Sequence, residues 1–198
     1  MQIFKSVLIT LLFVILNMTT IDLEQLKYPI GKFDCPNTIT PEHIKSWISI
    51  LGHFSNRLEK LFKNLTYKQL DTPYSPDGWT IRQVVHHLSD SHQHSYTRFK
   101  WTLTEDKPII KAYEEKDWAE LPDAKTAPIE MSLLHLKAIH SKLVYLLKSL
   151  SIDDLNKNFN HPETNEEVVL KYNIGMYAWH SNHHYAHIEN LLIRKNWK

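Results

Sequence analysis

Four stretches of the chain repeat apolar residues at the helical period of 3.6, and this pattern constrains the fold more than any other feature. The stretches cover residues 41–65, 81–103, 128–150 and 168–194. The chain contains only four glycines, and no segment shows convincing alternation of the kind that β-strands produce. We therefore predict an all-α fold built from four amphipathic helices.

The segments between these stretches predict how the helices are joined. Turn-forming residues are dense from Leu70 to Gly78, and Thr80 with Gln83 forms a capping box that starts the second helix. Residues 104–126 are acidic and aromatic, and we expect a long, partly helical connection there. Residues 151–165 are expected to be a loop. The result is a four-helix bundle with one long crossover between helices two and three.

The N-terminus allows two interpretations. Lys5 and the apolar run Val7–Leu16 have the charge and length of a secretory signal, but the run is too short to span a bilayer as a stable helix. No good small-residue cleavage site follows it, and Met18 offers an internal start, which we favour. We predict that residues 1–25 are an extension and residues 26–198 one domain. We expect the protein in the cytoplasm, with export as the alternative.

Composition excludes several classes of protein. Lys plus Arg (23) and Asp plus Glu (22) leave a net charge of +1, so no strong field favours a nucleic-acid partner or an acidic membrane. We expect no nucleic-acid partner and no stable membrane span. The only cysteine, Cys35, excludes an intrachain disulfide framework and any zinc site that needs several thiolates. A metal site would need other ligands.

Histidine is the metal ligand that the chain has in excess. There are 13 histidines, and eight of them fall in two short stretches, residues 86–94 and 180–187. The two stretches lie on the second and fourth predicted helices, which can pack side by side in a bundle. Three neutral imidazoles with an open fourth position form a catalytic zinc arrangement, and nickel also accepts such ligands.

On the fourth predicted helix, two histidine pairs have the i, i+4 spacing that places both rings on one helix face. The helix turns about 100° per residue. On that wheel His180 and His184 lie on the inner flank, roughly 70° from the centre of the apolar stripe. His183 and His187 lie roughly 110° away and are expected to face the rim or solvent. We therefore favour His180 and His184 as ligands.

On the second predicted helix, the period does not choose clearly among the histidines. His92 lies nearest the stripe centre, with His87 and His86 on opposite flanks, so the residues alone slightly favour His92. Asp90, three residues after His87, could orient an imidazole or act as a base, and an exposed acidic residue is an equally good interpretation. Arg98 could recognise an anionic substrate, but a surface ion pair is the better expectation.

Five motifs occur in order along the chain: Gly78–His92, Ser95–Lys100, Trp118–Asp123, Phe159–Glu163 and Tyr177–His184. Together they resemble the YfiT family of metal-dependent hydrolases, within the DinB-like superfamily. The resemblance covers about Leu26 to the C-terminus. It implies a homodimeric cytoplasmic protein with a DinB-like four-helix bundle that holds one zinc or nickel ion per subunit through three histidines.

The resemblance also implies which histidines are the ligands. The second histidine of the His-His-Leu-x-Asp motif is His87, and the first and third histidines of Trp-His-x-x-His-His are His180 and His184. His180 and His184 agree with the helical wheel. His87 rests on the resemblance alone, and it replaces the weak preference for His92. The family pattern begins near Leu26, which supports the internal start.

The leading hypothesis is a hydrolase in which a zinc ion, or nickel, activates water for attack on a small-molecule substrate. The alternative that the resemblance offers is an S-transferase that binds a low-molecular-weight thiol of the bacillithiol type as thiolate. A metal-binding structural protein without turnover is a third interpretation. The residues do not identify the substrate or a general base.

Overall fold

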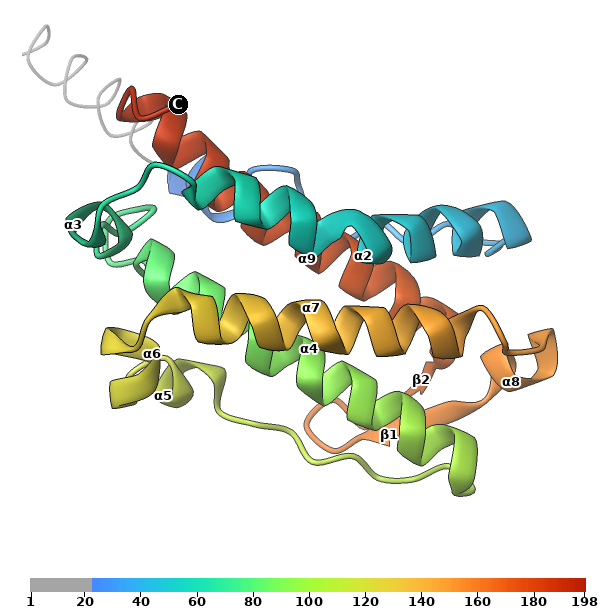
Figure 1. Ribbon diagram of the computed structural model, residues 1–198. Helices are drawn as coiled ribbons and strands as arrows, with labels where there is room; N and C mark the ends of the chain where they lie inside the picture. Colours follow the sequence, from blue (N-terminus) through green and yellow to red (C-terminus); the bar gives the residue numbers. More distant parts are fainter. Residues whose placement is uncertain (1–22) are drawn as a thin grey trace, which may run out of the picture.

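The computed structural model describes residues 23–198, so the signal-like run at residues 7–16 lies outside the described residues. Four long helices form a bundle (Figure 1), which confirms the predicted all-α fold. No helix within residues 23–198 is long and apolar enough to cross a membrane. The long helices are α2 (Pro41–Phe62), α4 (Ile81–Thr104), α7 (Ile129–Leu147) and α9 (Leu170–Arg194).

The first two long helices begin at capping boxes, of which the second is predicted from the sequence. The hydroxyl of Thr80 accepts a hydrogen bond from the backbone N–H of Gln83 at 3.2 Å, and the Gln83 side chain accepts the N–H of Thr80 at 2.9 Å. Thr40 caps α2 in the same way, with His43 as the reciprocal partner. Such caps satisfy backbone donors that have no partner inside the helix.

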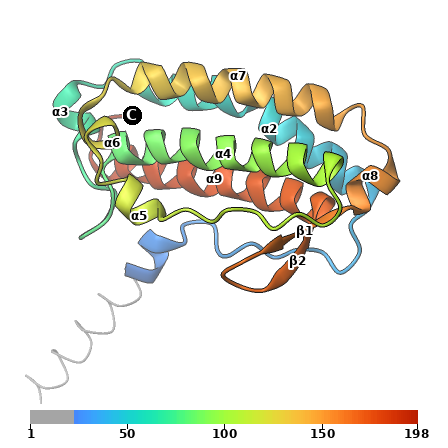
Figure 2. The same ribbon diagram turned by 90° about the horizontal axis from the view of Figure 1, so that it is seen from below.

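The predicted crossover gives the bundle its topology. Helices α2 and α4 each pack against both α7 and α9. Residues 105–128 return along the length of the bundle, so α4 and α7 run in the same direction (Figures 1 and 2). Two short helices interrupt this return, α5 (Glu115–Trp118) and α6 (Pro122–Thr126), as the partly helical prediction requires.

The prediction of a loop over residues 151–165 is wrong in part. A short helix, α8 (Ile152–Asn156), precedes an antiparallel hairpin of β1 (Asn158–His161) and β2 (Glu166–Val169). Strands of four residues offer too few alternating positions to be recognised in a sequence. The crossover also supports β1, since backbone hydrogen bonds join it to Pro108 and Ile110. The helix α3 (Tyr67–Leu70) lies just before the segment predicted as turns and shares only Leu70 with it.

Two apolar clusters form the core, and a layer of histidines lies between them. Phe54, Leu88 and Ile188 belong to one cluster, and Phe99 and Ile174 belong to the other. The four histidines of α9 lie between the segments that contribute to the two clusters, and so do His92 on α4 and His140 on α7. Polar groups in such a layer need hydrogen-bond partners or a ligand, because burial without them is costly.

Candidate metal centre

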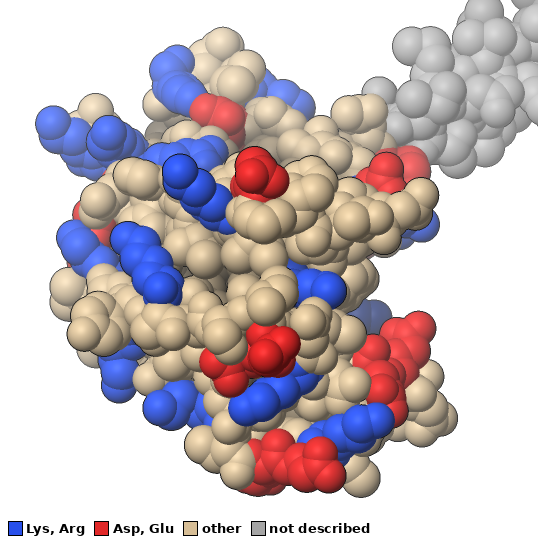
Figure 3. Space-filling model, turned by 90° about the vertical axis from the view of Figure 1, so that its right-hand side faces the viewer, with Lys and Arg blue, Asp and Glu red and all other residues tan. Residues whose placement is uncertain are grey.

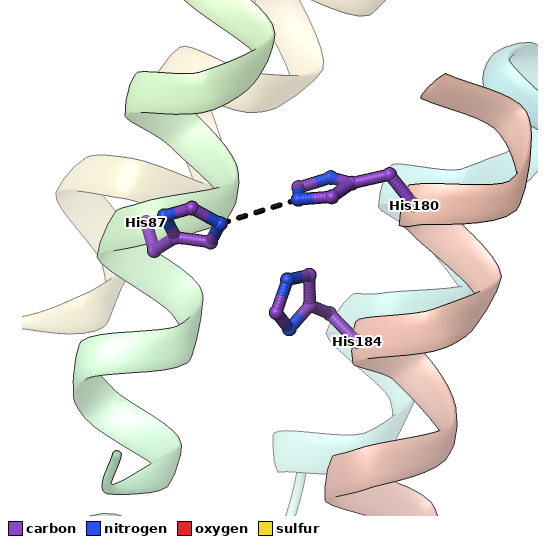
Figure 4. Close-up of side chains that lie close together, drawn as sticks. All are labelled: His87, His180 and His184. Carbon is purple, nitrogen blue, oxygen red and sulfur yellow. Dashed lines mark hydrogen bonds between the residues drawn. The ribbon is translucent and has the colours of Figure 1, made fainter. Parts of the chain in front are cut away.

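Three histidines from two neighbouring helices bring their rings together in the polar layer. His87 extends from α4, and His180 and His184 extend from α9, with their rings directed toward one another (Figure 4). One ring nitrogen of each lies within 4.8 Å of the others. The Nε2 atoms of His87 and His180 are 3.2 Å apart. Two nitrogens bound to one tetrahedral zinc ion would be roughly 3.4 Å apart, so the spacing fits a shared ion.

Burial keeps these imidazoles neutral. It lowers the pKa of His87 to about 4, and it lowers the pKa values of His180 and His184 well below 6.5, with neighbouring imidazoles adding to the effect. A histidine must be unprotonated to bind a metal, so the site is prepared for one at neutral pH. Two unprotonated nitrogens repel each other at 3.2 Å, and a proton or a cation between them removes that repulsion.

A chain of hydrogen bonds behind His180 crosses all four long helices. The Nδ1 atom of His140 donates to the backbone carbonyl of Leu51 at 2.8 Å, because a carbonyl can only accept. In neutral rings, His92 Nδ1 then donates to His140 Nε2 at 2.8 Å, and His180 Nδ1 donates to His92 Nε2 at 3.3 Å. This core route leaves a lone pair on His180 Nε2, the atom that faces His87.

A shorter chain of hydrogen bonds lies behind His184. The Nε2 atom of His187 donates to the backbone carbonyl of Lys27 at 3.0 Å. His187 Nδ1 is therefore an acceptor, and His184 Nδ1 donates to it at 3.3 Å. This N-terminal route leaves the lone pair of His184 on Nε2. Hydrogen bonds of this kind to the second ring nitrogen orient metal-binding histidines.

Tyr113 supports the third histidine, and sequence reasoning missed it. Its hydroxyl lies 3.4 Å from Nδ1 of His87, and burial raises its pKa, so it remains protonated. Asp90, which the sequence offered for this role, makes no hydrogen bond to His87 within the described chain. Burial and the nearby Asp123 raise the pKa of Asp90 to about 6. Tyr113 lies in the crossover, where no helical period could have indicated it.

The other candidate histidines of α4 lie outside this cluster of three. His92, which the wheel favoured, lies behind His180 and is fully buried. His86 uses both ring nitrogens, on Ser132 Oγ at 2.7 Å and the Ala127 carbonyl at 3.2 Å. Neither ring is free to join the cluster. Whether His87, His180 and His184 hold a metal stays a prediction.

The expectation that His183 and His187 face the rim or solvent is wrong, since both are buried. His187 stacks on Tyr74 with ring centres 4.0 Å apart, and His183 stacks on Trp179 at 4.5 Å. The chain before α2 and the loop before α4 cover this side of α9. A helical wheel shows which face of a helix turns toward the bundle. It does not show which other faces are covered by non-helical segments.

Two cavities give small molecules access to the cluster. One, of about 750 Å³, is lined by all three clustered histidines together with Trp79 and Trp179. The other, of about 590 Å³, is lined by His180, Tyr113 and Arg98. Both are also lined by Glu115 and Lys116, so they adjoin at His180. These volumes are in the range of ordinary small-molecule sites.

Known proteins resemble this chain over most of its length. Residues 52–188 match the DinB superfamily. A protein of Bacillus cereus strain B4264, named "Putative metal-dependent hydrolase", is 53% identical over 175 residues, which are 88% of this chain and 100% of that protein. A protein of Bacillus anthracis strain A0248 with the same name is 52% identical over the same shares.

A solved structure shares the fold as well. It is described as YfiT from Bacillus subtilis, "a probable metal-dependent hydrolase with an unusual four-helix bundle topology". It is 44% identical, has a TM-score of 0.86, and the match covers 88% of this chain and 99% of that one. The sequence resemblance is therefore confirmed: this chain belongs to the DinB superfamily and, within it, to the family of YfiT.

Proposed function

We propose that this protein is a metal-dependent hydrolase in which His87, His180 and His184 hold one divalent ion. Zinc is our first choice and nickel the second, since both accept three imidazoles. The observation that carries the proposal is the meeting of three neutral ring nitrogens within 4.8 Å, two of them with hydrogen-bond routes that leave Nε2 unprotonated. The names of the relatives support the same class of reaction.

When bound, an ion with an open position would lower the pKa of water to about 7 and polarise a substrate carbonyl. The chain's own residues orient the ligands and enclose the substrate. His92 and His187 each accept the Nδ1 proton of one ligand, and the Tyr113 hydroxyl lies at Nδ1 of the third. Trp79 and Trp179 line the cavity beside the cluster.

The family resemblance supports two further parts of the proposal. We propose that the protein acts on a small molecule in the cytoplasm and that it is a homodimer. Light scattering on the full-length protein after size exclusion tests the second point, with a mass of twice 23.4 kDa as the expected result. A monomer mass across the concentration range would contradict it.

The central test compares the full-length protein loaded with zinc or nickel, stripped of metal, and carrying His180→Ala. We expect hydrolysis of members of an ester and amide panel only by the loaded wild type. A second arm adds bacillithiol and an electrophile. Conjugation without hydrolysis would favour the S-transferase instead, and bound metal without activity in either arm would favour a structural protein.

A further inference from the structure

Arg98 differs from the other three arginines of the chain in having no side-chain partner among residues 23–198. Arg82, which is also buried, donates to Asp71 Oδ1 at 2.7 Å and to the Ala127 carbonyl at 2.8 Å. Arg57 and Arg194 also donate side-chain hydrogen bonds. Arg98 is 9% exposed, and its Nε atom has no hydrogen-bond partner. The surface ion pair expected from the sequence is therefore wrong.

A buried guanidinium without a counter-ion is unfavourable unless something else binds it. No carboxylate between residues 23 and 198 lies within 4.0 Å of Arg98, as the ion pairs found there all involve other cations. Arg98 lines the 590 Å³ cavity that also contains His180. The missing partner can therefore be an anion that enters this cavity beside the metal centre.

The rest of the cavity limits what that anion can be. Four glutamates line it, Glu114, Glu115, Glu163 and Glu166, and all four are exposed, so water screens them. They would still repel a multiply charged ligand. On the face shown in Figure 3, basic and acidic side chains are interspersed without a large patch of one sign. A small group with a single negative charge suits this environment better than a polyphosphate.

We propose that Arg98 binds a carboxylate of the substrate, so that the molecules cleaved at the neighbouring metal centre are carboxylate-bearing esters or amides. The planar guanidinium can donate two parallel hydrogen bonds to a carboxylate. Asn173 and Tyr172 line the same cavity and offer further polar contacts. The choice of substrate rests on the proposed function, whereas binding of the carboxylate at Arg98 does not.

The first experiment measures binding alone, on the full-length protein with and without zinc. Propionate is titrated while NMR follows the backbone amide signals, which every variant has, and the Nε–H signals of the four arginines, with Arg98 assigned by its loss in Arg98→Gln. We expect a saturable shift of the Arg98 signal and a dissociation constant at least about tenfold higher in Arg98→Gln, as for loss of a charge-assisted hydrogen bond. Lys100→Gln, which removes an exposed charge from the same helix, is the control and should bind as wild type.

Arg98→Lys keeps the positive charge but loses the planar guanidinium that donates two parallel hydrogen bonds, so it should bind propionate with intermediate affinity. This variant also tests the proposal if Arg98→Gln fails to fold. Unchanged propionate binding in a folded Arg98→Gln protein would overturn the proposal. Tighter binding of inorganic phosphate than of propionate at the Arg98 signal would overturn the choice of a carboxylate.

A second experiment compares kcat/KM for phenyl hydrogen succinate and phenyl butyrate, which differ by a terminal carboxylate. The wild type should prefer the succinate ester by at least about tenfold, Arg98→Gln should lose this preference, and Lys100→Gln should keep it. A preference that survives Arg98→Gln would overturn the substrate class. If neither these esters nor any member of the ester and amide panel is cleaved, the proposed hydrolase falls, while the propionate titration still decides the carboxylate site.

Discussion

The core route and the N-terminal route do the same chemical task in different surroundings. Each ends on a backbone carbonyl and leaves Nε2 of one histidine unprotonated, His180 in one case and His184 in the other. The core route joins four helices through the centre of the bundle. The N-terminal route stays on α9 until it reaches Lys27, in a segment that precedes the bundle. The difference predicts how strongly a substitution in each route will lower the affinity for zinc.

The largest effect on metal binding is expected at the three histidines of the cluster. His180→Ala and His184→Ala should each abolish stoichiometric binding of zinc, because two histidines and water replace three protein ligands. His87→Ala should do the same. Metal content after dialysis, measured by mass spectrometry, is the test.

His183→Ala is the matched control, since it removes a buried histidine of the same helix that lies on neither route, and it should keep its metal. If His92→Ala loses its metal and His87→Ala keeps it, the third ligand is His92, which the helical wheel alone favoured.

Within the core route, His140→Phe should lower zinc affinity by about 10- to 100-fold, as loss of outer partners of a ligand does. The substitution leaves the Leu51 carbonyl and the Nδ1 proton of His92 without partners in a sealed interior. It should also reduce the free energy of unfolding by about 1–3 kcal/mol. Competition with a chelator measures the first effect and urea unfolding the second.

Leu143→Ala separates the two effects. This buried leucine lies three residues further along α7 and on no route. Its truncation should cost about 2–5 kcal/mol of stability and leave zinc affinity near the wild-type value. An equal loss of affinity in both variants would mean that stability, not orientation, controls the metal site.

A smaller effect is expected from His187→Phe in the N-terminal route. The change in zinc affinity should be about tenfold, at the low end of outer-partner effects. His184 and His187 line the 750 Å³ cavity, so water can accept the Nδ1 proton of His184 in place of His187. The same chelator competition applies, with His183→Phe as the control. A loss larger than that of His140→Phe would reverse the ranking of the two routes.

The smallest predicted difference is in the pH dependence of stability. Burial lowers the pKa of His140 to about 4, partly offset by its bond to Leu51, while the unfolded chain titrates near 6.5. Between these values the unfolded state binds more protons, so the free energy of unfolding falls as pH drops from about 6.5 toward 4. Above pH 6.5 the contribution is fully present.

Urea unfolding of the metal-free protein between pH 7 and pH 4.5 measures this slope. His140→Phe should show a shallower slope than the wild type, because one depressed histidine has been removed. If His140→Phe has the same slope as the wild type, other buried groups produce the pH dependence. His135→Phe is a useful comparison, since His135 lies on the same helix outside the core route.

The sequence predicts the bundle well, because each long helix has its own apolar period. It also predicts His180 and His184, whose spacing and face can be read on one helix. His87 could be found only by resemblance: the wheel measures depth in the bundle, and the deepest histidine, His92, lies behind His180 and outside the cluster. His140 lies among the apolar residues of the helix predicted over residues 128–150, but its partners, Leu51 on α2 and His92 on α4, follow only from how the helices pack.

The crossover that makes α4 and α7 parallel has a consequence for how the chain reaches this structure. The helices α2 and α7 pack together, as do α4 and α9, although more than 60 residues separate Phe62 from Ile129 and Thr104 from Leu170. Closing so long a loop costs chain entropy before the contact can repay it, and folding rates fall as contacts become less local. We therefore expect this protein to fold more slowly than bundles of similar size whose consecutive helices alternate in direction, with α9 docking among the last steps.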